Sequence, residues 1–171
     1  TVEVESEKGV GSIFTVRIPF KTAAEQPSVE QKQEAPDLEL VKGMHVLLAE
    51  DNKLNLEIAQ FFLNTAGITS TSVQNGKEAV ETFEGSAVHE YDAILMDIMM
   101  PFMDGLEATQ KIRALEREDA DTVPIIAMTA NAFVEDKKQA MAAGMTDYIT
   151  KPLQSELLLH LLAKYAPKRK H

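Results

Sequence analysis

The sequence of 171 residues contains no cysteine, which excludes disulfide bonds, thiolate catalysis and cysteine metal sites. No apolar run reaches the roughly 18 residues that a membrane-spanning helix needs, and no signal peptide opens the chain. Basic residues are not in excess: the formal net charge is −10, which argues against a nucleic-acid-binding surface. We therefore expect a cytoplasmic domain without direct membrane or nucleic-acid contact.

The composition is otherwise that of a globular domain, with 44% hydrophobic and 26% charged residues. The chain is long enough for one full domain and an appendage. It begins at Thr1 without a methionine, so we expect it to be a piece of a longer protein.

The first 42 residues divide into two segments of different composition. Residues 1–20 alternate apolar and polar side chains on both sides of a G-V-G-S turn, which predicts a β-hairpin. Residues 21–42 are rich in glutamate, glutamine, alanine and proline, a composition typical of a linker. Its last apolar residues, Leu38, Leu40 and Val41, are expected to enter the next domain as an extended segment.

From residue 43 to 168 the chain alternates five predicted strands with five predicted helices. Five βα units predict an α/β domain in which helices cover both faces of a parallel sheet. The more polar second strand is expected at an edge of the sheet. Strands are expected at 44–49, 68–73, up to 97, 124–128 and 146–150, and helices at 53–66, 75–83, 105–117, 132–142 and 153–165.

Acidic side chains stand where two of these strands end. Residues 91–105 read Y-D-A-I-L-M-D-I-M-M-P-F-M-D-G, a strand buried on both faces that ends in Asp97 before a proline and glycine turn. Residues 44–52 read M-H-V-L-L-A-E-D-N and end in Glu50 and Asp51. Because α/β proteins build their sites at the carboxyl ends of parallel strands, we expect the three acids to share a site.

Two further polar groups follow the last two strands. Residues 124–130 read P-I-I-A-M-T-A and end in a hydroxyl, Thr129, and residues 146–152 read T-D-Y-I-T-K-P and end in Lys151. Taken singly, Thr129 is explained as a strand-end hydroxyl and Lys151 as a surface lysine. Together with the acids they place five polar groups, in order, at one edge of the sheet.

These motifs resemble the receiver domain of two-component response regulators over residues 43–168. The resemblance implies a flavodoxin-like doubly wound (βα)5 fold, whose five-stranded parallel sheet has the order 2-1-3-4-5. The segment G-V-G-S-I-F-T-V-R-I-P resembles the last strand pair of a histidine-kinase ATP-binding domain. We therefore interpret residues 1–20 as the C-terminal hairpin remnant of that domain, residues 21–42 as a linker, and the parent as a hybrid sensor histidine kinase.

The resemblance also implies a metal site. Mg²⁺ (or Mn²⁺) would be bound by Glu50, Asp51 and Asp97 and by the backbone carbonyl of Met99. Close carboxylates repel one another unless a cation neutralises them, and hard oxygen ligands select such cations. Glu50 stands where many receivers have an aspartate, and its longer side chain should still reach the metal.

By the same resemblance, Asp97 is the phosphoacceptor in a phosphorelay. It would take the phosphoryl group of a phosphohistidine on a histidine kinase or histidine phosphotransfer protein, and later hydrolyse it slowly. Lys151 would neutralise the phosphoryl oxygens, and the Thr129 hydroxyl and Ala130 amide would contact them. The junction of Lys151 with Pro152 resembles the cis-proline junction of the family.

Two more features of the resemblance concern signalling. Phosphorylation would move Thr129 and draw Tyr148 inward, which reshapes the face of the fourth helix, fifth strand and fifth helix. On the first helix, Leu54 and Phe61 are candidate docking contacts for a phosphotransfer protein, although Phe61 could also pack on the linker or hairpin. The arc expected to face the sheet holds Asn55, Ile58, Ala59, Phe62 and Ala66.

Other functions remain open at this point. A phosphatase of the haloacid dehalogenase type needs a second aspartate two residues after the nucleophile, where this chain has Met99. A pseudo-receiver would bind partners without being phosphorylated. A regulator with its own output domain agrees less well with the kinase-like hairpin. The hairpin also suggests a kinase parent, through which the chain would form a homodimer and which would be anchored in the inner membrane. The four histidines have no phosphohistidine context: His45, His89, His160 and His171.

Overall fold

The computed structural model describes residues 1–9, 11–18, 38–130 and 134–167, which fall into two units. The first is the predicted antiparallel hairpin of β1 (Val2–Glu7) and β2 (Gly11–Val16). Its register places Val2 opposite Val16 and Val4 opposite Phe14 on one face, and all four side chains are exposed. The hairpin thus has an apolar face that its own unit does not cover.

The second unit opens with the short helix α1 (Leu38–Val41), where an extended segment was expected. That expectation is wrong: the Lys42 amide donates to the Leu38 carbonyl oxygen at 3.1 Å and closes a helical turn. The turn directs Val41 into the core, where it is fully buried. Residues 21–37 of the predicted linker lie outside the described residues.

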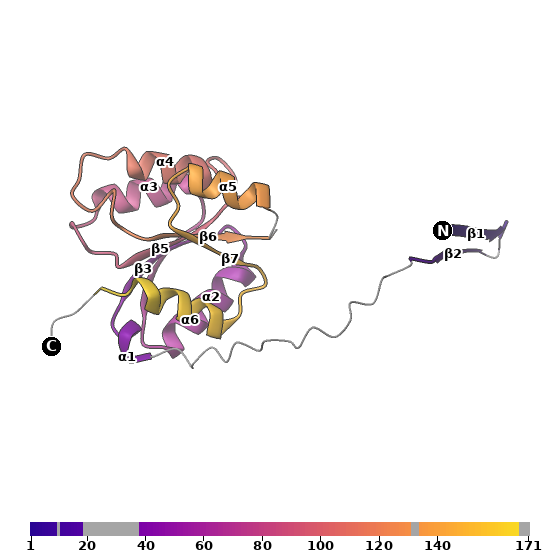
Figure 1. The fold of residues 1–171 in the computed structure, drawn as a ribbon, viewed down its shortest axis with the longest axis horizontal. Coiled ribbons are helices and arrows are strands. Elements are labelled where there is room, and N and C mark those ends of the chain that lie inside the picture. The colour runs from indigo at the N-terminus through magenta and orange to yellow at the C-terminus, as the bar shows by residue number, and fades with distance from the viewer. Residues whose placement is uncertain (10, 19–37, 131–133, 168–171) are drawn as a thin grey trace. The chain divides into compact units, whose positions relative to one another are not determined.

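Five parallel strands form the sheet of this unit, in the order β4-β3-β5-β6-β7. This order is the predicted 2-1-3-4-5, with the polar β4 at an edge (Figure 1). At the carboxyl ends of the central strands, Asp97 of β5 pairs with Met128 of β6, and Thr129 of β6 pairs with Thr150 of β7. The strands are β3 (His45–Ala49), β4 (Thr69–Val73), β5 (Ala93–Asp97), β6 (Ile125–Thr129) and β7 (Asp147–Thr150).

Helices cover both faces of the sheet. α2 (Lys53–Thr65) and α6 (Ser155–Tyr165) lie on one face, and α3 (Gly76–Gly85), α4 (Gly105–Arg113) and α5 (Val134–Ala142) lie on the other (Figure 1). A separate apolar core fills each side, and every residue of β5 and β6 is buried between them. The central strands are therefore held rigidly, and so is the polar residue at the end of each.

α4 is shorter than the sequence predicts. α4 ends at Arg113, four residues before the expected end, and the Arg113 guanidinium donates to the carbonyl oxygens of Ala120 and Gly144. This residue thus ties the chain after α4 to the turn before β7, which a longer helix would not allow. Residues 132 and 133 of the predicted fourth helix lie outside the described residues.

The helix after the acidic pair is capped as its sequence predicts. The Asn52 side chain accepts hydrogen bonds from the amides of Leu54 at 3.0 Å and Asn55 at 3.2 Å. Gly67, with φ of 74°, follows the C-terminal end of α2. The buried face is rotated from the expected arc, because Leu63 is fully buried whereas Ile58 is 38% exposed.

The described histidines lie apart from the acidic cluster of Glu50, Asp51 and Asp97. His45 bonds through its ring to the Thr71 hydroxyl, His89 donates its backbone amide to Asp119, and His160 is exposed. His171 lies outside the described residues. Among the described helices, none has both the length and the apolar character that crossing a bilayer requires.

Candidate functional site

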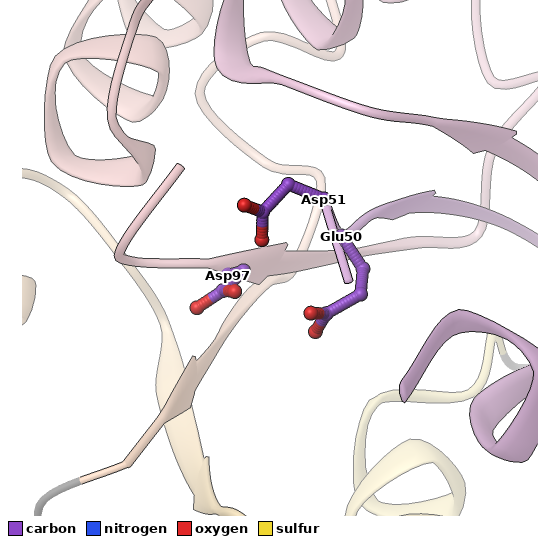
Figure 2. Close-up of side chains that lie close together, drawn as sticks. All are labelled: Glu50, Asp51 and Asp97. Atoms are coloured by element: carbon purple, nitrogen blue, oxygen red, sulfur yellow. The ribbon is translucent and has the colours of Figure 1, made fainter. Parts of the chain in front are cut away.

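Three carboxylates gather at the carboxyl ends of two neighbouring strands. Glu50 and Asp51 follow β3 and Asp97 ends β5, and one oxygen from each lies within 4.8 Å of the others (Figure 2). Glu50 and Asp97 are only 1% and 5% exposed, whereas Asp51 is open to solvent. The predicted acidic cluster is therefore present and partly desolvated.

Lys151, which directly follows β7, contacts two of these acids. Its Nζ lies 2.6 Å from Glu50 Oε2 and 2.6 Å from Asp97 Oδ2. The Lys151 amide also donates to the Thr129 carbonyl oxygen at 2.8 Å, which fixes the start of the turn after β7. The peptide bond between Lys151 and Pro152 is cis, as expected.

The two oxygens of the buried Glu50 carboxylate have different partners. Its Oε1 accepts hydrogen bonds from the Asn52 amide at 3.2 Å and from Asn55 Nδ2 at 3.1 Å. Its Oε2 lies against Lys151 but has no aligned hydrogen-bond donor among the described residues. Asn55 was predicted only to face the sheet, and its contact with Glu50 was not predicted, although an amide in the first helical turn after the acids was the available signal.

Burial and charge act against each other on the central pair. Burial raises the pKa of Asp97 above its usual range; the hydrogen bond and charge of Lys151 oppose this, and the charge of Glu50 adds to it. For Lys151 burial acts to lower the pKa, but the hydrogen bond to Asp97 and the charges of Asp97 and Glu50 raise it above its usual range. The charge of Lys151 thus partly offsets the effect of burial on Asp97.

The remaining predicted phosphoryl contacts lie around a hollow of about 300 Å³ next to the acids. Thr129 is buried at the end of β6, and Ala130 after it is exposed. The Met99 amide donates to Asp97 Oδ1 at 3.2 Å, which turns the loop after β5 back onto the acid. The hollow is lined by Ile98, Met99, Asp104, Leu106, Thr129, Ala130 and Gln139.

Tyr148 does not belong to the acidic cluster. It is half-buried on β7, its hydroxyl accepts a hydrogen bond from Lys137 of α5, and the Lys137 Nζ lies 4.1 Å from the centre of its ring. The ring thus bridges the last strand and α5.

The two candidate docking residues are both exposed on α2. Leu54 is 65% and Phe61 is 66% exposed, and the Phe61 ring lies 6.1 Å from the Phe62 ring, centroid to centroid. Two more apolar side chains, Met99 and Phe102, are exposed in the loop after Asp97. Apolar side chains therefore project from both segments that carry the acids.

This donor set fits a hard divalent cation. It offers three carboxylates, and one buried carboxylate oxygen lacks an aligned hydrogen bond among the described residues. Softer metals prefer thiolate or imidazole ligands, which are absent from this cluster.

A family model, the response regulator receiver domain, matches residues 46–163. The chain is 36% identical over 155 residues to hybrid signal transduction histidine kinase L of Dictyostelium discoideum, with 90% of this chain and 9% of that protein covered. It is 31% identical over 176 residues to the sensor protein EvgS of Escherichia coli, with 99% and 14% covered. The chain spans only a small part of these curated relatives.

Solved structures agree. The receiver domain of sensor histidine kinase PA1611 from Pseudomonas aeruginosa, with a magnesium ion in its active site cleft, is 40% identical at a TM-score of 0.66, and 72% of this chain and 98% of that chain are covered. A chain of the complex between the Saccharomyces cerevisiae histidine phosphotransfer protein Ypd1 and the Ssk1 receiver domain is 30% identical at a TM-score of 0.67, with 74% and 90% covered.

The fold and site therefore define an α/β domain with an acidic cluster at the carboxyl edge of its parallel sheet, and the chain belongs to the response regulator receiver domain family. Its relatives include the receiver parts of hybrid histidine kinases. The phosphatase alternative is set aside, because the family match places the chain among receivers.

Gly105 sets the position of Asp97 and gives a test of that geometry. A Cβ at Gly105 would lie 2.1 Å from the Asp97 carbonyl oxygen, so Gly105→Ala must displace the end of β5. We expect it to reduce the free energy of unfolding by about 1–3 kcal/mol, as overpacking does. Urea denaturation measures the change.

Gly85→Ala is the matched control, because a Cβ there meets nothing within 4 Å and the residue closes α3. It should leave stability unchanged or raise it by roughly 0.4–1 kcal/mol. Similar stability for the two variants would show that Gly105 does not constrain the strand end.

Proposed function

We propose that this domain is the phosphoacceptor of a two-component phosphorelay, in which Asp97 takes the phosphoryl group of a phosphohistidine. The observation that carries the proposal is the placement of Asp97 at the end of a buried central strand, 2.6 Å from the Lys151 ammonium and beside two further acids. Membership of the receiver family supports it. The similarity to a receiver crystallised with a histidine phosphotransfer protein supports a protein donor of that kind.

The proposed step is a substitution at phosphorus. A carboxylate oxygen of Asp97 forms a bond to phosphorus while the bond from phosphorus to the imidazole nitrogen of the donor breaks. The electron pair of that bond stays on the imidazole, which takes up one proton. Lys151 is placed to neutralise the phosphoryl oxygens, and the Thr129 hydroxyl and Ala130 amide would donate hydrogen bonds to them.

A divalent cation completes the proposed site. Glu50, Asp51, Asp97 and the Met99 carbonyl would hold Mg²⁺ (or Mn²⁺), and the magnesium in the similar PA1611 receiver supports this assignment. When bound, the cation supplies positive charge to the phosphoryl oxygens and lessens the repulsion among the acids.

We also infer that the parent protein is a hybrid sensor histidine kinase. The similarity to EvgS extends over 99% of this chain, well beyond the receiver match at residues 46–163, and so includes the hairpin. The exposed apolar face of Val2, Val4, Phe14 and Val16 agrees with a strand pair from the edge of a larger ATP-binding domain. The sequence that precedes Thr1 in the parent decides this point: a segment without an ATP-binding domain would refute it.

Replacing the phosphoacceptor tests the function directly. With acetyl phosphate and Mg²⁺, the protein should gain one phosphate by mass, and Asp97→Asn should gain none because the amide is not a nucleophile. Asp104→Asn is the matched control: the same change in the same loop, at an acid that caps α4. Lys151→Ala should still bind Mg²⁺ yet lose most phosphotransfer.

A phosphate on Asp97→Asn would refute the assignment of the acceptor. Absence of phosphorylation in the wild-type protein with both acetyl phosphate and a phosphorylated phosphotransfer protein would favour the pseudo-receiver.

The exposed apolar side chains of α2 predict a docking surface. Leu54→Ala and Phe61→Ala should slow transfer from a histidine phosphotransfer protein about tenfold, because each removes an exposed apolar side chain from the helix that follows Glu50 and Asp51. Phosphorylation by acetyl phosphate should be unchanged, since a small donor needs no docking surface. Rates with the two donors are compared for each variant.

Val88→Ala serves as the control, because Val88 is 49% exposed in the loop that precedes β5, at the opposite end of that strand. Equal losses with both donors would indicate a damaged helix, and unchanged rates with both would remove the docking role.

The contact between Lys137 and Tyr148 predicts how the switch is read out. If phosphorylation moves Thr129 and draws Tyr148 inward, the tyrosine hydroxyl must leave Lys137, and the link between β7 and α5 is lost. NMR of the Tyr148 ring with and without beryllofluoride should show two environments. An unchanged ring environment in the beryllofluoride-bound protein contradicts the switch.

A further inference from the structure

Asn55 is the one side chain among the described residues that donates a hydrogen bond to Glu50 from outside the acidic cluster. It stands in the first turn of α2, and its own amide is fixed by the Asn52 cap at 3.2 Å. The Asn52 amide donates to the same Glu50 oxygen, Oε1, at 3.2 Å. The cap and first turn of α2 therefore hold one oxygen of a carboxylate that is only 1% exposed.

These two hydrogen bonds also determine where the other Glu50 oxygen, Oε2, lies. With Oε1 held by two donors, Glu50 Oε2 is directed to the side where Lys151 Nζ lies at 2.6 Å and where Asp97 and Asp51 present their oxygens. A glutamate has one more rotatable bond than an aspartate, and immobilising such a side chain costs conformational entropy. A donor that fixes the rotamer in the folded protein meets that cost before any ligand arrives.

We propose that Asn55 is a positioning residue for the cation site, and that it acts by holding Glu50 Oε2 toward the other two acids. The inference rests on the proposed function, because it concerns the divalent cation of that site. Partners that orient a ligating carboxylate are worth about 10–100-fold in metal affinity in other proteins. The role belongs to glutamate at this position: shortening the acid by one carbon–carbon bond withdraws the carboxylate by about 1.5 Å from Asn55.

The test measures Mg²⁺ affinity without any phosphoryl transfer. The Met99 amide, which donates to Asp97 Oδ1, is followed by NMR as MgCl2 is added. Asn55→Leu keeps the approximate size of the side chain but removes the donor, and it should weaken Mg²⁺ binding at least tenfold. Asn64→Leu, on the exposed face of the same helix, should leave the affinity within twofold of the wild type.

A double-variant comparison separates positioning from a general effect on the fold. In a Glu50→Asp background the addition of Asn55→Leu should change Mg²⁺ affinity less than twofold, because the shorter acid no longer reaches Asn55. A purely structural role would weaken binding equally in both backgrounds and would overturn the proposal. Asn55→Ser, whose hydroxyl is too short to reach Oε1, replaces Asn55→Leu if that variant does not fold.

The outcomes also separate this inference from the function it rests on. If the wild type shows no Mg²⁺-dependent shift at Met99, the cation site itself is wrong and the inference falls with it. If the wild type binds Mg²⁺ and Asn55→Leu binds equally well, only the role of Asn55 is overturned.

Discussion

The structure depends on one electrostatic compromise at the carboxyl edge of the sheet. Two carboxylates, Glu50 and Asp97, are almost fully withdrawn from water, and a single ammonium, that of Lys151, lies 2.6 Å from each. With Asp51 included, three carboxyl groups lie close together and share this one lysine. Burying a charged group costs free energy unless an opposite charge pairs with it. The cluster therefore depends on Lys151, and a further bound cation would stabilise it.

The fold makes this compromise possible because it holds the charges rather than letting them relax. β5 and β6 are buried over their whole length between two apolar cores, so their ends cannot move apart. The loop after Asp97 is held equally closely, since Gly105 leaves no room for a side chain against the Asp97 carbonyl. Rigid strands thus carry the acids, while the hollow and the exposed side chains around them remain accessible.

Much of this could be predicted from the sequence, because strand ends are local features. Apolar runs located the strands of the sheet, and the residues after them located Glu50, Asp97, Thr129 and Lys151 correctly. The failures came where tertiary contacts decide. Burial of Val41 makes a helical turn of a segment that reads as extended, and the rotation of α2 about its axis exposes Ile58.

Asn55 shows the same limit within the site. Helical periodicity placed it on the inner face, which is correct, but periodicity cannot tell a packed side chain from one that donates to a buried acid. That distinction needs the position of Glu50 Oε1, which only the folded chain supplies. The register of a helix relative to a carboxylate is a three-dimensional quantity, and propensity carries no information about it.

The contact between Lys151 and Asp97 joins residues 54 positions apart, and the lysine is supplied by the last strand and turn of the domain. During synthesis, every other charged member of the cluster leaves the ribosome before it. A chain that stops short of β7, or that has not yet docked it, holds its acids without their cation. The ion pairs of Lys151 with Asp97 and Glu50 are therefore among the last contacts of the domain that can form during synthesis.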